Sequence, residues 1–306
     1  MSSTPLCAPS DTHHFCVADL PLTITFVGYE HGERLLPSFK PFRSAQEYAD
    51  EQLFSLIVDD HIRPVPKAER KRIRDFDTGN GVTIVDKLND GGYQFIIKNI
   101  NGADCCLLIA DKEFRSCRCA LNGNWLMRSF GLNNAIMLIY AFAGAYRSTV
   151  LMHASVVRQH GYGYAFIAKS GTGKSTQVSN WLKYLPDCDL MNDDNPVVRV
   201  IGNECFIYGS PWSGKTPCYR NIKAPLGAVT RIDRASANSV EQLEPIEAFA
   251  SLLPSVSSMK WDETIYEKIC QTLSKIIEHT GIYILHCLPD RNSAEVCNKA
   301  IGRQKD

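Results

Sequence analysis

The stretch Ala168–Thr176 reads AKSGTGKST and decides how the surrounding chain is expected to fold. It matches the phosphate-binding pattern G-x-x-x-x-G-K-[ST], except that Ala168 stands at the first glycine. Small residues let consecutive backbone N–H groups surround phosphate oxygens, and the N-terminus of the helix that follows attracts the same anion. The pattern predicts Lys174 on the β- and γ-phosphates and the Ser175 hydroxyl on Mg²⁺. The expected cofactor contacts are Ser170, Gly171, Thr172, Gly173, Lys174, Ser175 and Thr176.

The segments on either side of this loop are those that the motif requires. Tyr162–Ala168 is a short apolar run that predicts a buried strand. Lys174–Leu185 has apolar residues at helical spacing, and Pro186 ends the helix. Strand, loop and helix therefore follow in the right order, which favours a nucleotide loop over a glycine-rich turn with a chance lysine.

Charge and composition exclude several classes of partner. The chain has 306 residues, with 33 Lys+Arg balanced by 33 Asp+Glu. A formal charge of zero gives no sign of a nucleic-acid or anionic-membrane partner. The basic stretch Lys67–Arg74 is interrupted by Glu69, so we interpret it as a solvated loop or helix face and not as a polyanion site.

The cysteines and the N-terminus indicate a cytoplasmic protein. The twelve cysteines are scattered without a C-x-x-C pair, and residues 1–19 lack a signal-peptide pattern, so we expect reduced thiols. The apolar run Ala135–Ala145 is shorter than the about 20 residues of a membrane span. We expect instead a buried helix over about 131–147, capped by Asn133 or Asn134.

The pattern along the chain predicts an α/β protein of two domains, a β-rich domain over 1–130 and a nucleotide-binding catalytic domain over 131–306. In the first domain, the turn signals DTGN (77–80) and NDGG (89–92) separate strand-like segments. The expected strands are Leu22–Val27, Leu53–Val58, Gly81–Val85, Tyr93–Ile100 and Cys105–Ala110. In the second, a hairpin turns at Gly202–Asn203, a strand covers Leu226–Ile232, and helices cover Ile246–Leu253, Glu263–His279 and Ser293–Gly302.

Two further groups of residues suit phosphoryl transfer. Asp193–Asp194 follows an apolar stretch, and one carboxylate of such a pair can bind Mg²⁺ while the other accepts a proton from a hydroxyl. An Asp-rich turn is the alternative, and the residues alone leave open which aspartate has which role. His153, in LMHASVV, is placed to orient the base carboxylate, although a lone histidine is more often structural.

A second stretch, Gly209–Thr216 (GSPWSGKT), also fits the literal phosphate-loop pattern. Pro217 follows at once and leaves little room for a helix, so a second nucleotide loop is not expected. We interpret the stretch as a loop that brings Lys215, with a catalytic role, or Arg220 to the transferring phosphoryl group. An exposed turn remains the alternative.

Together these motifs resemble a known family. His153, the loop Ala168–Ser175 and the pair Asp193–Asp194 resemble, in this order, the catalytic domain of bacterial HPr kinase/phosphorylase, and more loosely ATP-dependent phosphoenolpyruvate carboxykinase. The likeness covers about residues 150–235. The longer pattern HASVV, SGTGKST, NDDNPVVR, YGSPWSGKTP is identified as that of a branch of HPr-kinase-like proteins.

The resemblance implies a phosphoenolpyruvate-carboxykinase-like P-loop domain on a mixed sheet, with ATP and Mg²⁺ as cofactors. By the same resemblance Asp194 accepts the proton, His153 assists it, and Asp193 and Ser175 serve the metal. Thr176–Gln177 departs from the family, which has Glu after the loop serine, and the family's E-I-R-G-L-G segment is not visible. HPr itself as the acceptor is therefore not implied.

We expect an ATP- and Mg²⁺-dependent kinase that phosphorylates a hydroxyl of an unidentified protein, peptide or small-molecule acceptor. Lys174 and Lys215 would neutralise developing charge, and Asp194 would take the proton. The main alternative is a nucleotide-binding sensor or scaffold without transfer activity. Carboxykinase chemistry lacks identifiable residues for a second metal and for oxaloacetate. A homo-oligomer is left open, and neither nucleic acid nor membrane is expected as a partner.

Overall fold

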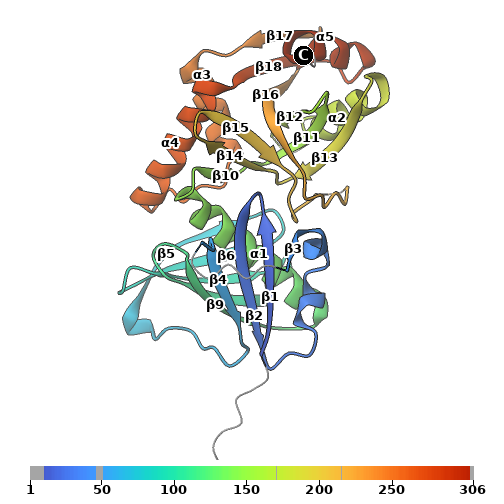
Figure 1. Cartoon of the computed structure of the whole chain (residues 1–306). Coiled ribbons are helices and arrows are strands. Elements are labelled where there is room, and N and C mark those ends of the chain that lie inside the picture. Colours follow the sequence, from blue (N-terminus) through green and yellow to red (C-terminus); the bar gives the residue numbers. More distant parts are fainter. Residues whose placement is uncertain (1–9, 46–50, 170, 215, 304–306) are drawn as a thin grey trace, which may run out of the picture. The chain divides into compact units, whose positions relative to one another are not determined.

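The computed structural model describes residues 10–45, 51–169, 171–214 and 216–303, and the chain forms two compact units, Met1–Ala143 and Gly144–Asp306 (Figure 1). Each unit contains a mixed sheet, so the chain is α/β as the sequence predicts. The units divide after Ala143 and not after residue 130. The reason is helix α1 (Trp125–Ala145), which packs on the first sheet, where the Tyr140 hydroxyl donates to the Val17 carbonyl at 3.0 Å.

The first unit is built on a nine-stranded sheet in the order β3-β1-β2-β4-β9-β8-β7-β6-β5. Strands β2, β4 and β9 run parallel, and the other neighbours pair antiparallel. The strands are β1 (Ser10–Val17), β2 (Leu20–Val27), β3 (Arg43–Ser44), β4 (Phe54–Val58), β5 (Arg70–Asp77), β6 (Val82–Leu88), β7 (Tyr93–Lys98), β8 (Asp104–Ala110) and β9 (Ser116–Leu121). Three short 3₁₀ helices accompany them: η1 (Gly32–Leu35), η2 (Pro37–Phe42) and η3 (Lys67–Glu69).

Helix α1 begins earlier than the sequence predicts. Its first turn is capped by Asn124, whose side-chain oxygen accepts from the Met127 amide at 3.1 Å. The expected caps, Asn133 and Asn134, lie inside the helix, and their side chains donate back to the carbonyls four residues earlier, at 3.1 and 2.8 Å. The interpretation of these asparagines as caps is therefore wrong, because amide side chains can also bond within a helix.

The basic stretch Lys67–Arg74 is neither a loop nor a helix face over most of its length. After η3 it forms β5, the edge strand of the sheet, and most of its residues there are exposed. Arg70 and Arg72 both pair with the buried carboxylate of Asp86, the latter at 2.5 Å from Nε to Oδ1. Charge along an edge strand also discourages pairing with another chain.

The second unit also contains a nine-stranded sheet, with the order β10-β14-β15-β16-β12-β11-β13 and with β18 and β17 added beyond β16. The long strand β16 pairs antiparallel with β15 and parallel with β12 and β18. The strands are β10 (Thr149–Leu151), β11 (Ala154–Gln159), β12 (Tyr162–Ile167), β13 (Cys188–Asp194), β14 (Val197–Ile201), β15 (Glu204–Tyr208), β16 (Lys223–Arg234), β17 (Ser239–Gln242) and β18 (Gly281–Cys287).

Helices cover this second sheet through separate contacts. α2 packs against β11, β12 and β13 and beside α5, whereas α4 contacts β10, β14, β15 and β18 (Figure 1). The helices are α2 (Lys174–Tyr184), α3 (Pro245–Leu252), the 3₁₀ turn η4 (Leu253–Ser255), α4 (Glu263–His279) and α5 (Arg291–Ile301). Trp181 of α2 is fully buried against the rings of Tyr164 and Phe166, at centroid distances of 5.2 and 5.4 Å. This apolar contact fixes α2 over β12, the strand that leads into the phosphate-binding motif.

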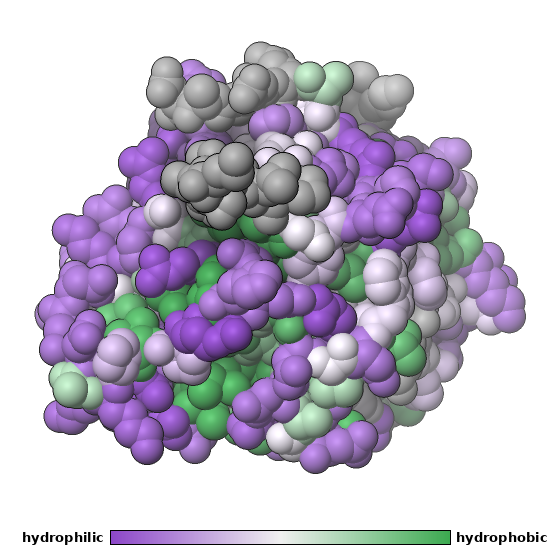
Figure 2. Space-filling model, turned by 90° about the horizontal axis from the view of Figure 1, so that it is seen from below, coloured by the Kyte–Doolittle hydropathy of each residue, from purple (hydrophilic) through white to green (hydrophobic). Residues whose placement is uncertain are grey.

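The surface of the molecule combines polar residues with apolar patches, and the first unit contains a cavity. Seen from below, the molecule is mostly hydrophilic, with apolar residues visible in hollows between polar ones (Figure 2). A cavity of about 470 Å³ in this unit is lined by Ile57, Ile109 and Arg118 among others.

The described cysteines are free thiols. Within the described ranges, no helix combines the length and the apolar character that a membrane span requires.

Candidate functional site

The described part of the loop between β12 and α2 contains two glycines with a positive φ. Gly171 and Gly173 have φ values of 77° and 136°, which residues with side chains rarely adopt. Among the described residues, no side chain caps the N-terminus of α2, and the first N–H groups of a helix are donors that a ligand can use. Ala168, the mismatch in the motif, is not among the described residues with positive φ, and alanine fits there without strain. Ser170 lies outside the described residues.

The register of the sheet brings His153 and the aspartate pair to this loop. Ala154, the first residue of β11, lies opposite Ile167 at the end of β12 and opposite Asp194 at the end of β13. His153 therefore stands between the start of the loop and Asp194. Its backbone is fixed from the other side, where the His153 amide donates to the Ser255 carbonyl at 2.6 Å.

Lys174, His153 and Asp194 form a continuous polar chain. The Lys174 ammonium lies 2.8 Å from His153 Nε2, and His153 Nδ1 lies 3.1 Å from Asp194 Oδ1. Because an ammonium only donates, Nε2 must accept and Nδ1 must carry the proton that faces Asp194. Lys174 also donates to the Ala168 carbonyl at 3.3 Å. Partial burial lowers the pKa of Lys174, and the nearby carboxylates of Asp194 and Asp193 oppose that shift.

The two aspartates have different environments. Asp193 is 7% exposed; its Oδ1 accepts from the Ser155 hydroxyl at 2.7 Å, and its Oδ2 accepts from the Thr216 amide at 3.3 Å. The Asp194 side chain is 34% exposed and faces His153. Asp194 also has a φ of 123°, a strained value for a residue other than glycine. The structure thus makes Asp194 the accessible carboxylate.

The stretch Gly209–Thr216 packs directly on the aspartate pair. Ser213 forms an isolated bridge with Asp194, and the Ser213 hydroxyl donates to the Asp193 carbonyl at 2.9 Å. Ser210 is fully buried and donates to the Asn195 carbonyl at 2.6 Å. Within the described residues no helix follows this stretch, as Pro217 leads us to expect. Its described contacts instead hold the end of β13 in place.

Of the two basic residues expected to reach the phosphoryl group, Lys215 and Arg220, the structure describes only Arg220. Lys215 lies outside the described residues, and its predicted role stays a prediction. Arg220 is described, and its guanidinium pairs with Asp189 at 2.8 Å, together with Arg158 from β11. The suggestion that Arg220 meets the phosphoryl group is therefore not supported, because the side chain is engaged with Asp189.

Ser175 and Thr176, both expected to contact the cofactor, are exposed in the first turn of α2.

Arg234, which the sequence analysis did not single out, contacts the loop through two hydrogen bonds. It ends β16, and its guanidinium donates to the Thr172 carbonyl at 3.0 Å and to the Gly171 carbonyl at 2.6 Å. The signal available in the sequence was its place at the carboxyl end of a strand, the edge where ligands bind in α/β sheets.

Two cavities meet at the loop, and both are lined by Thr172 and Ile232. The first, of about 330 Å³, has a mainly apolar wall that includes Leu288 and Pro289. The second, of about 630 Å³, is lined by the polar residues His153, Lys169, Arg231, Asp233 and Ser251, among others. The loop therefore separates a mainly apolar recess from one whose wall mixes charged and polar side chains with apolar ones.

No family model and no curated protein sequence matches this chain. Among solved structures, the chain is similar to the HPr(Ser) kinase/phosphatase from Coxiella burnetii, with 9% sequence identity and a TM-score of 0.29. The match covers 49% of this chain and 91% of that one. A similarity of this strength says nothing about the activity of the present chain.

Proposed function

We propose that the protein is an ATP- and Mg²⁺-dependent phosphotransferase that transfers the γ-phosphate to a hydroxyl of an acceptor. The observation that carries the proposal is the chain from Lys174 through His153 to Asp194, at the open N-terminus of α2. A purely structural loop does not need a lysine at the start of α2, a histidine just before β11 and a strained aspartate at the end of β13 in one chain of contacts. Perturbed groups and backbone strain are common at functional sites.

The residues fit a nucleotide polyphosphate. The glycine backbone and the first N–H groups of α2 suit its anionic oxygens. When a nucleotide binds, the Lys174 ammonium would replace its contact with His153 Nε2 by a contact with a phosphate oxygen. The apolar recess between Thr172 and Leu288 suits a flat base, whereas the larger recess beside His153, with charged side chains in its wall, suits the acceptor. Arg234 keeps the loop in position from the neighbouring strand.

In this proposal Asp194 accepts the proton of the attacking hydroxyl. His153 donates its Nδ1 proton to Asp194 Oδ1, which orients the carboxylate and leaves its other lone pairs for the acceptor. Mg²⁺, when bound, would neutralise charge on the phosphates, with Ser175 and a carboxylate as its protein ligands. The donor set allows this, because each Asp193 oxygen accepts one hydrogen bond and keeps a further lone pair for the metal.

Phosphate transfer from labelled ATP into fractionated lysate of the source organism tests the proposal. Asp194→Asn should lower the transfer rate by about 10²- to 10⁴-fold with little change in ATP affinity, because a general base contributes about that much. Lys174→Ala should weaken ATP binding as well as transfer. Two variants serve as matched controls. Lys183→Ala changes an exposed lysine of α2, and Asp187→Asn changes an exposed carboxylate just before β13.

A wild-type transfer rate in Asp194→Asn would show that the proton-acceptor assignment is wrong. The second candidate is a nucleotide sensor, and one observation favours it: Asp194 Oδ2 already accepts from the Asn195 side chain at 2.7 Å, so each Asp194 oxygen already has one hydrogen-bond donor. A sensor would bind ATP with the same dependence on Lys174 and would label no acceptor in any fraction. Binding and transfer therefore separate the two candidates.

A further inference from the structure

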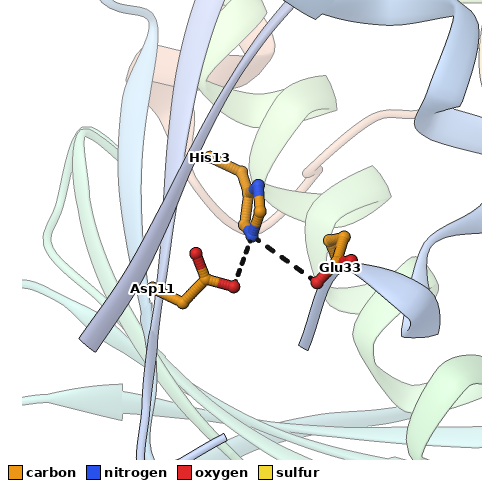
Figure 3. Close-up of side chains that lie close together, drawn as sticks. All are labelled: Asp11, His13 and Glu33. Carbon is orange, nitrogen blue, oxygen red and sulfur yellow. Dashed lines mark hydrogen bonds and ion pairs between the residues drawn. The ribbon is translucent and has the colours of Figure 1, made fainter. Parts of the chain in front are cut away.

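Three side chains of the first unit converge on one point, outside the site described above (Figure 3). Asp11 and His13 are two residues apart on β1, so their side chains lie on the same face of the strand. Glu33 comes from η1, which follows β2. Asp11 Oδ2 lies 2.8 Å from His13 Nε2, and Glu33 Oε2 lies 3.7 Å from the same nitrogen. The three potential ligand atoms all lie within 4.8 Å of one another.

The protein itself does not satisfy this cluster. A single Nε2–H donates in one direction, and the geometry gives that proton to Asp11. Glu33 Oε2 is buried and has no hydrogen-bond partner in the part of the chain that the structure describes. Its side chain is only 18% exposed, and the Arg43 guanidinium, at 3.9 Å, faces the other oxygen, Oε1. A buried carboxylate oxygen without a partner is costly, so something else is expected to bind it.

The surroundings of the cluster keep its groups close together and partly shielded from water. The His13 ring packs edge-on against Phe26 at 6.0 Å and lies 6.4 Å from Phe15, both of which are buried. Asp11, at 41% side-chain exposure, leaves one side open to solvent. The cluster is thus a recessed group of one nitrogen and two carboxylate oxygens with an entry path.

We propose that Asp11, His13 and Glu33 bind a divalent transition-metal ion of the zinc type. Imidazole nitrogen with carboxylate oxygen suits Zn²⁺, whereas Mg²⁺ and Ca²⁺ prefer oxygen ligands alone. On binding, the His13 proton moves from Nε2 to Nδ1 by exchange with solvent, so the ring stays neutral and Nε2 coordinates the ion. Glu33 Oε2 gains the partner that it lacks. Three protein ligands leave a coordination position for water or for a further ligand. The ion would also tie η1 to β1, which stabilises the first unit.

Zinc titration of the purified full-length chain, stripped with a chelator and kept reduced, tests the proposal. Wild type should bind one Zn²⁺ that His13→Ala and Glu33→Gln lose or bind at least tenfold more weakly. His14→Ala is the matched control, because His14 is the next residue on β1 and its side chain instead bonds to Thr23 at 3.0 Å. The control should keep wild-type affinity, and Mg²⁺ should not compete with Zn²⁺.

Because the chain has twelve cysteines, zinc could bind thiolates elsewhere, and a second readout separates that outcome. Co²⁺ in the proposed site should show only the weak visible bands of nitrogen and oxygen ligands, without the strong ultraviolet band of thiolate coordination. Circular dichroism of each variant checks the fold. The proposal is overturned if folded Glu33→Gln and His13→Ala bind Zn²⁺ as wild type does, or if the bound Co²⁺ carries the thiolate band.

Discussion

Asp194 combines a polar function with a strained backbone. Its φ of 123° is one that glycine adopts freely and other residues adopt at a cost of about 1–3 kcal/mol. Asp194 ends β13 opposite Ala154, the first residue of β11, and at this point its side chain contacts His153. The strain is therefore held where the proposed chemistry needs a carboxylate.

A pair of substitutions measures this strain. Asp194→Ala and Asp194→Gly lose the same carboxylate, but only glycine relieves the backbone. We expect Asp194→Gly to be more stable than Asp194→Ala by about 1 kcal/mol, after the greater flexibility of glycine in the unfolded chain is counted. Urea denaturation of the two variants gives the difference. Equal stabilities would mean that the position is not strained.

At the scale of elements, the strand β13 is held in the sheet by a carboxylate between two guanidinium groups. Asp189 Oδ1 accepts from Arg158 Nε at 3.0 Å, and Oδ2 lies 2.8 Å from Arg158 Nη2 and 2.8 Å from Arg220 Nη1. Burial alone would raise the pKa of Asp189, but the hydrogen bonds from Arg158 and Arg220 outweigh it and hold the pKa below its usual range. This ionic contact links β11, β13 and the segment after Gly209–Thr216.

The depressed pKa sets the sign of a pH effect. A carboxyl group with a lowered folded-state pKa stabilises the fold above its unfolded pKa, about 3.9, and this contribution is lost as the pH falls through the folded-state value. Asp189→Asn should therefore be less stable than wild type at pH 7, by at most about 1 kcal/mol because the carboxylate is partly screened by solvent. In urea denaturation the difference between the two proteins should shrink as the pH falls below the unfolded-state pKa. A difference that does not change with pH would contradict this account.

Many elements follow from local patterns in the sequence. α4 covers the predicted range Glu263–His279, and the turn signals of the first unit fall between β5, β6 and β7. Strands β1, β5 and β9 were missed for physical reasons. β1 alternates, but its core face carries Asp11 and His13; β5 is a charged edge strand; and β9 uses buried cysteines at core positions. Pairing with neighbours, which no local pattern encodes, makes these segments strands.

The site was predictable in its members more than in its geometry. The sequence pointed to Lys174, His153 and Asp194, but their order along the chain differs from the order of β11, β12 and β13 in the sheet. Only the register places His153 between the other two. Arg234 was missed because it follows the loop by many residues, and its role depends on the parallel pairing of β16 with β12.

For the whole molecule, the division into two compact units predicts that each of the two proposed ligands stabilises only the unit that binds it. The Asp11–His13–Glu33 cluster lies in the unit Met1–Ala143 and the loop between β12 and α2 in the unit Gly144–Asp306, each with its own sheet and core. A ligand that binds only the native state stabilises whatever must unfold to release it, by about 2.7 kcal/mol at a concentration of one hundred times its Kd. The stabilised region therefore shows which part of the chain opens as one cooperative unit.

Hydrogen–deuterium exchange, measured with one ligand at a time, shows which region of the chain each ligand stabilises. Saturating ATP should slow amide exchange in β12, β13 and α2 and leave β1 and β2 unchanged, because the loop belongs to the second core. Zn²⁺ should slow exchange in β1, β2 and η1 and leave α2 unchanged. Lys174→Ala and His13→Ala should each abolish only the effect of its own ligand. If either ligand slowed exchange in both units, the two sheets would open together, and the chain would behave as one cooperative structure in spite of its two cores.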